Sequence, residues 1–160
     1  MKLADTVQSK LAKLNNQTGQ RSSKASSTEI GEQAESLCKD FLKQKGLSFV
    51  AKNFSCKHGE IDLIMQREQQ YIFVEVRYRK SAMFGSGSAS VTAAKQRKLA
   101  RSAPAFLRSI GLSATTTPYR IDVIEASPDK RRDETAILDE DHNYFRQHRI
   151  RWIKNAICLF

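Results

Sequence analysis

The sequence is poor in cysteine and in long apolar runs, and each shortage excludes a class of protein. Only three of the 160 residues are cysteine, an odd number at wide spacings. They form no Cys-x-x-Cys pair and have no histidine at ligand spacing, so neither a disulfide framework nor a zinc site is expected. No apolar run approaches the roughly 18 residues of a membrane-spanning helix. The N-terminus also lacks the apolar segment of a secretion signal, so we expect a cytoplasmic protein.

Acidic residues are also scarce relative to basic ones. The chain has 17 acidic residues against 27 basic ones, which gives a formal net charge of +10. Residues 1–28 hold five basic residues and one acidic residue, so a basic tail supplies only part of the excess. Such a surface favours polyanions, nucleic acid first and an anionic membrane second. Charge alone does not show whether the basic surface binds a specific partner or is only solvated.

The chain divides into a tail and one folded domain. Residues 1–14 carry leucine and valine at helical spacing, but an isolated helix of that length is marginal in water. Residues 15–28 are polar and have no apolar anchor. We therefore predict a flexible basic N-terminal tail over residues 1–28 and a single α/β domain over residues 29–157.

Two helices are predicted in the domain. The first begins near Thr28, a plausible N-cap, and ends before Gly46. The second begins at about Val91, with Ser90 as its cap, and Pro104 is expected to kink it or to end its first half. Helical spacing of apolar residues supports both.

Short runs of strand-forming residues lie around these helices. The predicted strands cover residues 47–54, 60–65, 71–78 and 118–126. A Gly/Ser-rich loop is expected at 80–89, and residues 144–159 are compatible with a helix or a strand. The predicted order is helix, three strands, helix, strand and a C-terminal segment. That order is typical of a mixed β-sheet flanked by helices.

The two central strands carry the candidate chemistry. If they form an antiparallel hairpin in which Gln66 faces Tyr71, Asp62 falls opposite Glu75. Directly opposed like charges destabilise a sheet unless a cation lies between them. Oxygen-only ligands suit Mg²⁺ or Mn²⁺, so the pattern indicates a metal site at Asp62 and Glu75.

Other interpretations of this hairpin stay open at this stage. Glu60 falls opposite Arg77 in the same register, and the two residues would make an ordinary cross-strand ion pair. The two acids are also compatible with simple solvation, and a shift of the turn by one residue would separate them. The opposite strand face, with Ile72, Val74 and Val76 beside Ile61 and Leu63, is expected to be the core side.

Several motifs, in order along the chain, resemble the YraN family of bacterial proteins. The resemblance covers roughly residues 29–157. The motifs are Gly31-Glu32-Gln33-Ala34, Gly59-Glu60-Ile61-Asp62-Leu63-Ile64, Phe73-Val74-Glu75-Val76-Arg77-Tyr78-Arg79 and Ala93-Ala94-Lys95-Gln96. That family is related to the restriction-endonuclease-like superfamily, which includes archaeal Holliday-junction resolvases. The resemblance therefore implies a restriction-endonuclease-like fold and an active site of the PD-(D/E)xK type.

The motif residues carry over onto this chain with two departures. The resemblance implies that Asp62 and Glu75 are the metal-holding acids of a nuclease, with Mg²⁺ or Mn²⁺ as the cofactor. Ile61 replaces the motif proline, and Arg77 replaces the motif lysine. Arginine can bind a phosphate but cannot act as a base, so activation of water would fall to the metal, aided by Lys95. Glu32 matches a further acid on the first helix, although a helical wheel places it on the solvent side.

Basic residues surround this proposed centre. Cations that hold flanking phosphates beside metal-holding acids are what cleavage of a phosphodiester requires. The candidate nucleic-acid-binding residues are Arg79, Lys80, Arg97, Lys98 and Arg101. The sequence thus favours a metal-dependent endonuclease that acts on DNA, with RNA as a substrate and homodimerisation left open. The alternative is a non-catalytic nucleic-acid-binding protein that keeps the nuclease fold.

Overall fold

The computed structural model describes residues 27–79, 91–128, 142–145 and 148–157. The order helix, three strands, helix, strand is confirmed, and the C-terminal segment forms two strands. The elements are α2 (Ser27–Gln44), β1 (Ser48–Cys56), β2 (Gly59–Arg67), β3 (Gln70–Tyr78), α3 (Ala93–Ser109), β4 (Tyr119–Pro128), β5 (His142–Phe145) and β6 (His148–Ile153). Most of the predicted tail at 1–28 and the predicted loop at 80–89 lie outside the described residues.

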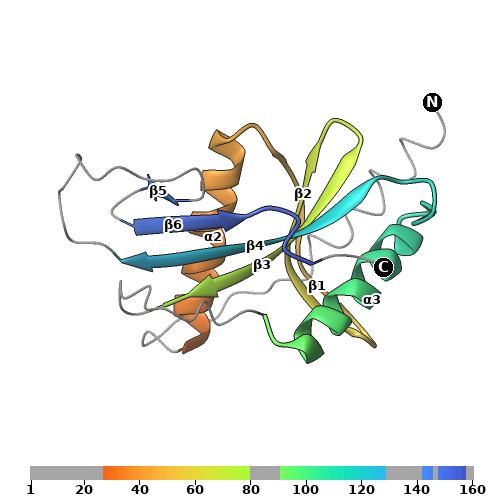
Figure 1. The fold of residues 1–160 in the computed structure, drawn as a ribbon, viewed down its shortest axis with the longest axis horizontal. Helices are drawn as coiled ribbons and strands as arrows, with labels where there is room; N and C mark the ends of the chain where they lie inside the picture. Colours follow the sequence, from red (N-terminus) through yellow and green to blue (C-terminus); the bar gives the residue numbers. More distant parts are fainter. Residues whose placement is uncertain (1–26, 80–90, 129–141, 146–147, 158–160) are drawn as a thin grey trace.

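The strands form one mixed sheet. Their order is β1-β2-β3-β4-β6-β5, and β3 and β4 run parallel while the other neighbours run antiparallel. Parallel neighbours cannot be joined by a tight turn, and α3 lies in the connection from β3 to β4. Figure 1 shows β3, β4 and β6 side by side, with the two helices packed against the sheet. The α/β class with a mixed sheet is therefore confirmed.

Both faces of the sheet are buried, so the expectation of a single core face is wrong. Ile72 and Val74 of β3 pack in a cluster with residues of α2, whereas Phe73 packs in a second cluster with residues of α3. Ile61 belongs to the α3 cluster and Leu63 to the α2 cluster, although the two residues were expected to share a face. The physical reason is the crossover helix, because a parallel connection places a helix over the second face.

The helix ends follow local backbone chemistry. Gly46, just beyond α2, has φ +86°, a left-handed conformation that glycine adopts without strain. At the start of α3 the cap is Thr92 and not Ser90, since the Thr92 hydroxyl accepts a hydrogen bond from the Lys95 backbone N–H at 3.3 Å. The helix continues through Pro104, so that proline does not end it.

Phe106 of α3 lies at the centre of the larger cluster. Its ring meets those of Phe54, Tyr71 and Phe73 at centroid distances of 5.2, 6.2 and 5.8 Å. These contacts fix α3 across β1, β2 and β3 and thereby set the position of its first turn. None of the described helices is long and apolar enough to cross a membrane.

Candidate functional site

The predicted register between β2 and β3 is confirmed where the two strands pair. Gln66 lies opposite Tyr71, and the pairing continues to Leu63 opposite Val74. No backbone pair between these two described strands follows beyond that point. Instead, the Asp62 Oδ2 atom accepts a hydrogen bond from the Val76 backbone N–H at 2.7 Å. The two strands therefore part at Asp62, and a carboxylate takes a position that a strand carbonyl would otherwise fill.

The Asp62 and Glu75 carboxyl groups meet at this point and share a hydrogen bond. Burial, followed by the charge of Asp62, raises the pKa of Glu75 to about 7. Burial also raises the pKa of Asp62, while the hydrogen bond from Val76 opposes that rise. Two carboxyl groups in contact cannot both ionise without cost, and a cation bound between them would remove that cost.

Lys95 of α3 joins this pair from above the sheet. Its Nζ atom lies 3.0 Å from Glu75 Oε2, and the Glu75 side chain is only 12% exposed. That oxygen is buried and has no hydrogen bond of good geometry, so the two groups attract mainly by charge. The ammonium lowers the pKa of Glu75 and only partly offsets the effect of burial. Three elements, β2, β3 and α3, thus each supply one charged group.

A further acid, Glu35 of α2, belongs to the same group of charges. Burial, followed by the charge of Asp62, raises the pKa of Glu35 to about 7. A hydrogen bond with Asn53 opposes this rise, and the Glu35 Oε2 atom is buried without a hydrogen-bond partner. Glu32, the acid selected from the sequence, is exposed on the same helix. The structure therefore brings Glu35, and not Glu32, to Asp62.

The helical pattern contained a signal for Glu35 that the sequence analysis missed. At about 100° per residue, Glu35 lies about 100° from Ala34, which faces the core, whereas Glu32 lies about 160° away. A residue at the edge of the apolar stripe can reach over the sheet, and one on the far side cannot. Glu32 was expected because it matches the motif Gly31-Glu32-Gln33-Ala34, which does not take the angle around the helix into account.

Arg77 and Arg79 face another acid. The strand register places Arg77 opposite Glu125 of β4, and its Nη1 atom lies 3.9 Å from Glu125 Oε1. Arg79 lies 3.6 Å from the same oxygen, and Arg151 of β6 lies 3.9 Å from the other. Glu125 is 3% exposed, and its contacts with these arginines were not predicted from the sequence. Arg77 thus occupies the motif-lysine position, but Lys95 is the cation paired with Glu75.

The remaining predicted basic residues lie on the outer side of α3. Arg97, Lys98 and Arg101 are exposed, and all three line one cavity with Lys57 and His58. Lys80 lies outside the described residues. The outer side of α3 is therefore basic, while its inner side carries Lys95 and the core residues.

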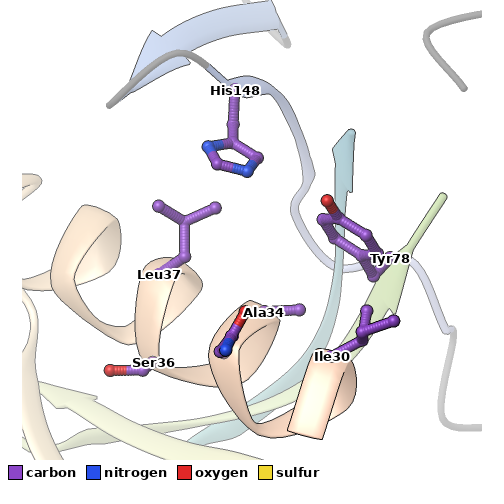
Figure 2. A pocket seen from close by; sticks show the side chains of 7 residues that line it. Ile30, Ala34, Ser36, Leu37, Tyr78 and His148 are labelled. Carbon is purple, nitrogen blue, oxygen red and sulfur yellow. The ribbon is translucent and has the colours of Figure 1, made fainter. Parts of the chain in front are cut away.

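A second cavity, of about 460 Å³, lies on the α2 side of the molecule. Figure 2 shows the Tyr78 and His148 rings across this cavity from side chains of α2. Its lining residues are Ile30, Gln33, Ala34, Ser36, Leu37, Tyr78 and His148. It contains none of the acids described above, so it is separate from the Asp62–Glu75 pair.

The Asp62 and Glu75 oxygens fit a hard divalent cation that takes its other ligands from water or phosphate. No group of three His, Cys, Asp or Glu side chains among the described residues forms a complete metal cage. Mg²⁺ nevertheless commonly uses only one or two carboxylates, with water and substrate phosphates as its other ligands. Asp62 and Glu75 meet that requirement, and the raised pKa values of both carboxyl groups indicate a place where a cation would reduce repulsion.

Comparison with known proteins places this chain in a family. A family model described as "Uncharacterised protein family UPF0102" matches residues 34–126. A UPF0102 protein of Colwellia psychrerythraea is 37% identical over 89% of this chain and 97% of its own length. Relatives in Vibrio campbellii and Saccharophagus degradans are 42% and 41% identical over 82% and 84% of the chain, and over 94% and 98% of their own lengths.

The matched range includes the residues that form the site. Residues 34–126 contain Glu35, Asp62, Glu75 and Lys95, but not Glu32 or the Gly31 before it. On the identity and coverage of these relatives, the chain belongs to the UPF0102 family, the YraN family that its motifs predicted.

Proposed function

We propose that this protein is a divalent-metal-dependent phosphodiesterase that cleaves DNA, and that its fold is the restriction-endonuclease-like one. The observation that carries the proposal is the meeting of Asp62, Glu75 and Lys95 from three different elements. Two hydrogen-bonded acids beside the half-buried Lys95 ammonium bring together a cation site and a phosphate-binding charge. The parallel β3–β4 pair and the helix on each face support the proposed fold.

Each side chain has a distinct role in the proposed reaction. Asp62 and Glu75 would hold Mg²⁺ or Mn²⁺, which would supply charge neutralisation at the scissile phosphate and a more acidic water. Lys95, whose Nζ atom lies 3.0 Å from Glu75 Oε2, would hold a phosphate oxygen of the substrate beside that carboxylate. In the hydrolysis itself, the water oxygen forms a bond to phosphorus while the bond to the leaving sugar oxygen breaks.

Glu35 is the group proposed to accept the proton of the attacking water. A general base works best when its pKa lies near the working pH, and the pKa of Glu35 is about 7. Its Oε2 atom is buried and makes no hydrogen bond within the described residues, so no other protein group there competes for it. Arg77 cannot take this role, since a guanidinium does not lose its proton.

The test is cleavage of DNA by the full-length protein. Plasmid, single-stranded and four-way-junction DNA are incubated with the protein in Mg²⁺, Mn²⁺ or EDTA. We expect cleavage that requires the metal and falls by at least about a hundredfold in Asp62→Asn and Glu75→Gln. Glu32→Gln is the matched control, because Glu32 is an exposed acid on the helix that carries Glu35. Equal cleavage by Asp62→Asn and the wild type would end the proposal.

One observation favours the rival function, a non-catalytic nucleic-acid-binding protein. Arg77 stands in the motif-lysine position and faces Glu125, so the expected catalytic cation is engaged elsewhere. In that case DNA binding is sensitive to salt and indifferent to EDTA, and no DNA is cut. The same gel assay, run beside a binding measurement in EDTA, separates the two functions. Gel filtration of the same protein tests whether it forms a homodimer, which the sequence leaves open.

A further inference from the structure

A strongly basic cavity of about 310 Å³ lies between the β1–β2 turn and the outer side of α3. Two of its residues, Lys57 and His58, come from the turn. The other residues lie at helical spacing on the face of α3 that is next to the β1–β2 turn. These residues are Ala94, Arg97, Lys98 and Arg101. The cavity therefore gathers four permanent positive charges from two elements that are distant in the sequence.

None of the acidic side chains of the described residues lines this cavity or forms an ion pair with its cations. The contrast with the rest of the sheet is clear, since Arg77 and Arg79 share Glu125 and Lys95 has Glu75. Like charges one helical turn apart destabilise a helix by a few tenths of a kcal/mol per pair. The fold thus holds cations together against their mutual repulsion, which is expected where an anion completes the group.

The walls of the cavity are fixed by close packing. Gly59 has φ +147°, and a Cβ atom placed on it would lie 3.3 Å from Lys98 Cβ. Only glycine lets the turn approach α3 so closely. Behind the turn, Cys56 Sγ lies 3.4 Å from Ser102 Oγ, and Phe54 packs edge-on against Phe106. The turn and the helix that carry the cations are therefore packed together, so less backbone entropy is lost when an anion binds.

The cavity adjoins the start of β2, the strand that carries Asp62, and lies on α3, the helix that carries Lys95. Strand β2 runs from Gly59 to Asp62 in three steps, a distance of about 10 Å at roughly 3.3 Å per residue. On α3, Lys95 precedes Lys98 by three residues, about 4.5 Å along the helix. We propose that this cavity binds a phosphate group of the nucleic acid, a few nucleotides from the bond at the acidic pair. This inference rests on the proposed function and adds the substrate contact that sets the position of the strand.

The experiment measures binding in EDTA with cleavage blocked. The full-length Asp62→Asn protein is titrated into a fluorescent single-stranded oligonucleotide of about 20 nucleotides, with and without a 5′-phosphate, over a series of salt concentrations. The test variant carries Lys57→Gln and Arg101→Gln in addition to Asp62→Asn. The matched control carries Arg108→Gln in addition to Asp62→Asn. Arg108 is an exposed arginine on the same helix that does not line the cavity.

We expect the double variant to bind about tenfold more weakly and to lose roughly 0.7 from the slope of log K against log salt, the value for one phosphate contact on a single strand. The control should change neither quantity. If the double variant binds both oligonucleotides more weakly, the ligand is an internal phosphodiester. If it binds only the phosphorylated oligonucleotide more weakly, the ligand is a terminal phosphate.

An unchanged affinity and slope in the double variant would overturn the inference. So would retained DNA binding together with lost binding to phosphatidylserine vesicles, because the cavity would then serve a membrane surface. These outcomes do not depend on cleavage, since every protein in the series carries Asp62→Asn and no metal is present. Failure of the wild type to cut DNA would therefore count against the proposed function alone.

Discussion

Replacing Glu75 by glutamine should stabilise the metal-free protein at alkaline pH. The pKa of Glu75 is raised from 4.5 to about 7, so the folded state binds a proton more tightly than the unfolded chain does. Stability is then lost as pH rises, because ionising Glu75 in the fold costs more than ionising it in the open chain. The penalty is nearly absent below pH 4.5, grows between 4.5 and 7, and is complete above 7. Glutamine keeps the shape of the side chain and never ionises.

The size of the effect follows from the raised pKa. At about 1.36 kcal/mol per pKa unit, a rise from 4.5 to about 7 corresponds to at most about 3.4 kcal/mol. The side chain is 12% exposed, and the protein can relax around the charge, so we expect about 1–2 kcal/mol in practice. For a chain of this size that is a rise in Tm of about 2–8 °C. At pH 4 the two proteins should differ much less.

The assay is urea and thermal unfolding in EDTA at pH 4 and at pH 8. Glu32→Gln is the control, since it removes an exposed acid from α2 and leaves the acidic pair intact. A Glu75→Gln protein that is less stable than the wild type at pH 8, or one whose advantage is the same at both pH values, would refute the reasoning. Either result would mean that Lys95 compensates fully for burial and for the charge of Asp62.

Three further predictions concern the site and the core. Lys95→Met should raise the pKa of Glu75 further, because the ammonium that lowers this pKa is removed. The pH above which Mn²⁺-dependent cleavage increases should then be higher than in the wild type, and Lys95→Arg should shift that pH less. A pH–rate profile of each variant measures the shift. Asp122→Asn should cost about 3–5 kcal/mol in urea unfolding, because the buried Asp122 carboxylate accepts hydrogen bonds from Arg120, Trp152 and the Asn155 backbone. Phe106→Ala should cost a similar amount, about 3–5 kcal/mol by thermal unfolding, since it empties the centre of the aromatic cluster.

The sequence predicted the hairpin well because two local rules fix it. Alternating side chains and a short turn determine which residues face each other, and Gln66 does lie opposite Tyr71. The register of β3 against β4 could not be obtained this way, because 40 residues separate the end of β3 from the start of β4 and the pairing is parallel. The arginines around Glu125 therefore had no predictable partner.

The helical acid shows the limit of motif reasoning. A motif fixes which residue types occur together, but a helix places successive residues about 100° apart, so a misplacement by three residues turns the side chain by about 60°. Glu32 and Glu35 differ in this way, and only the packing of Ala34 and Cys38 against the sheet separates them. The burial of both faces was missed for a related reason. Strand periodicity shows which residues share a face but not how many helices cover the sheet.

The place where β2 leaves β3 explains why the acids can be held together at all. Within the paired part of the hairpin, β2 and β3 hold each other in position, and two opposed carboxylates would push the strands apart. At Asp62 that mutual pairing has ended, yet β1 still holds β2 and β4 still holds β3 up to Tyr78. Each acid is thus fixed by a different neighbouring strand, and their repulsion cannot be relieved by moving the hairpin. Neutralisation must come from a proton, from Lys95 or from a bound cation, and the proposed reaction requires exchange among these three.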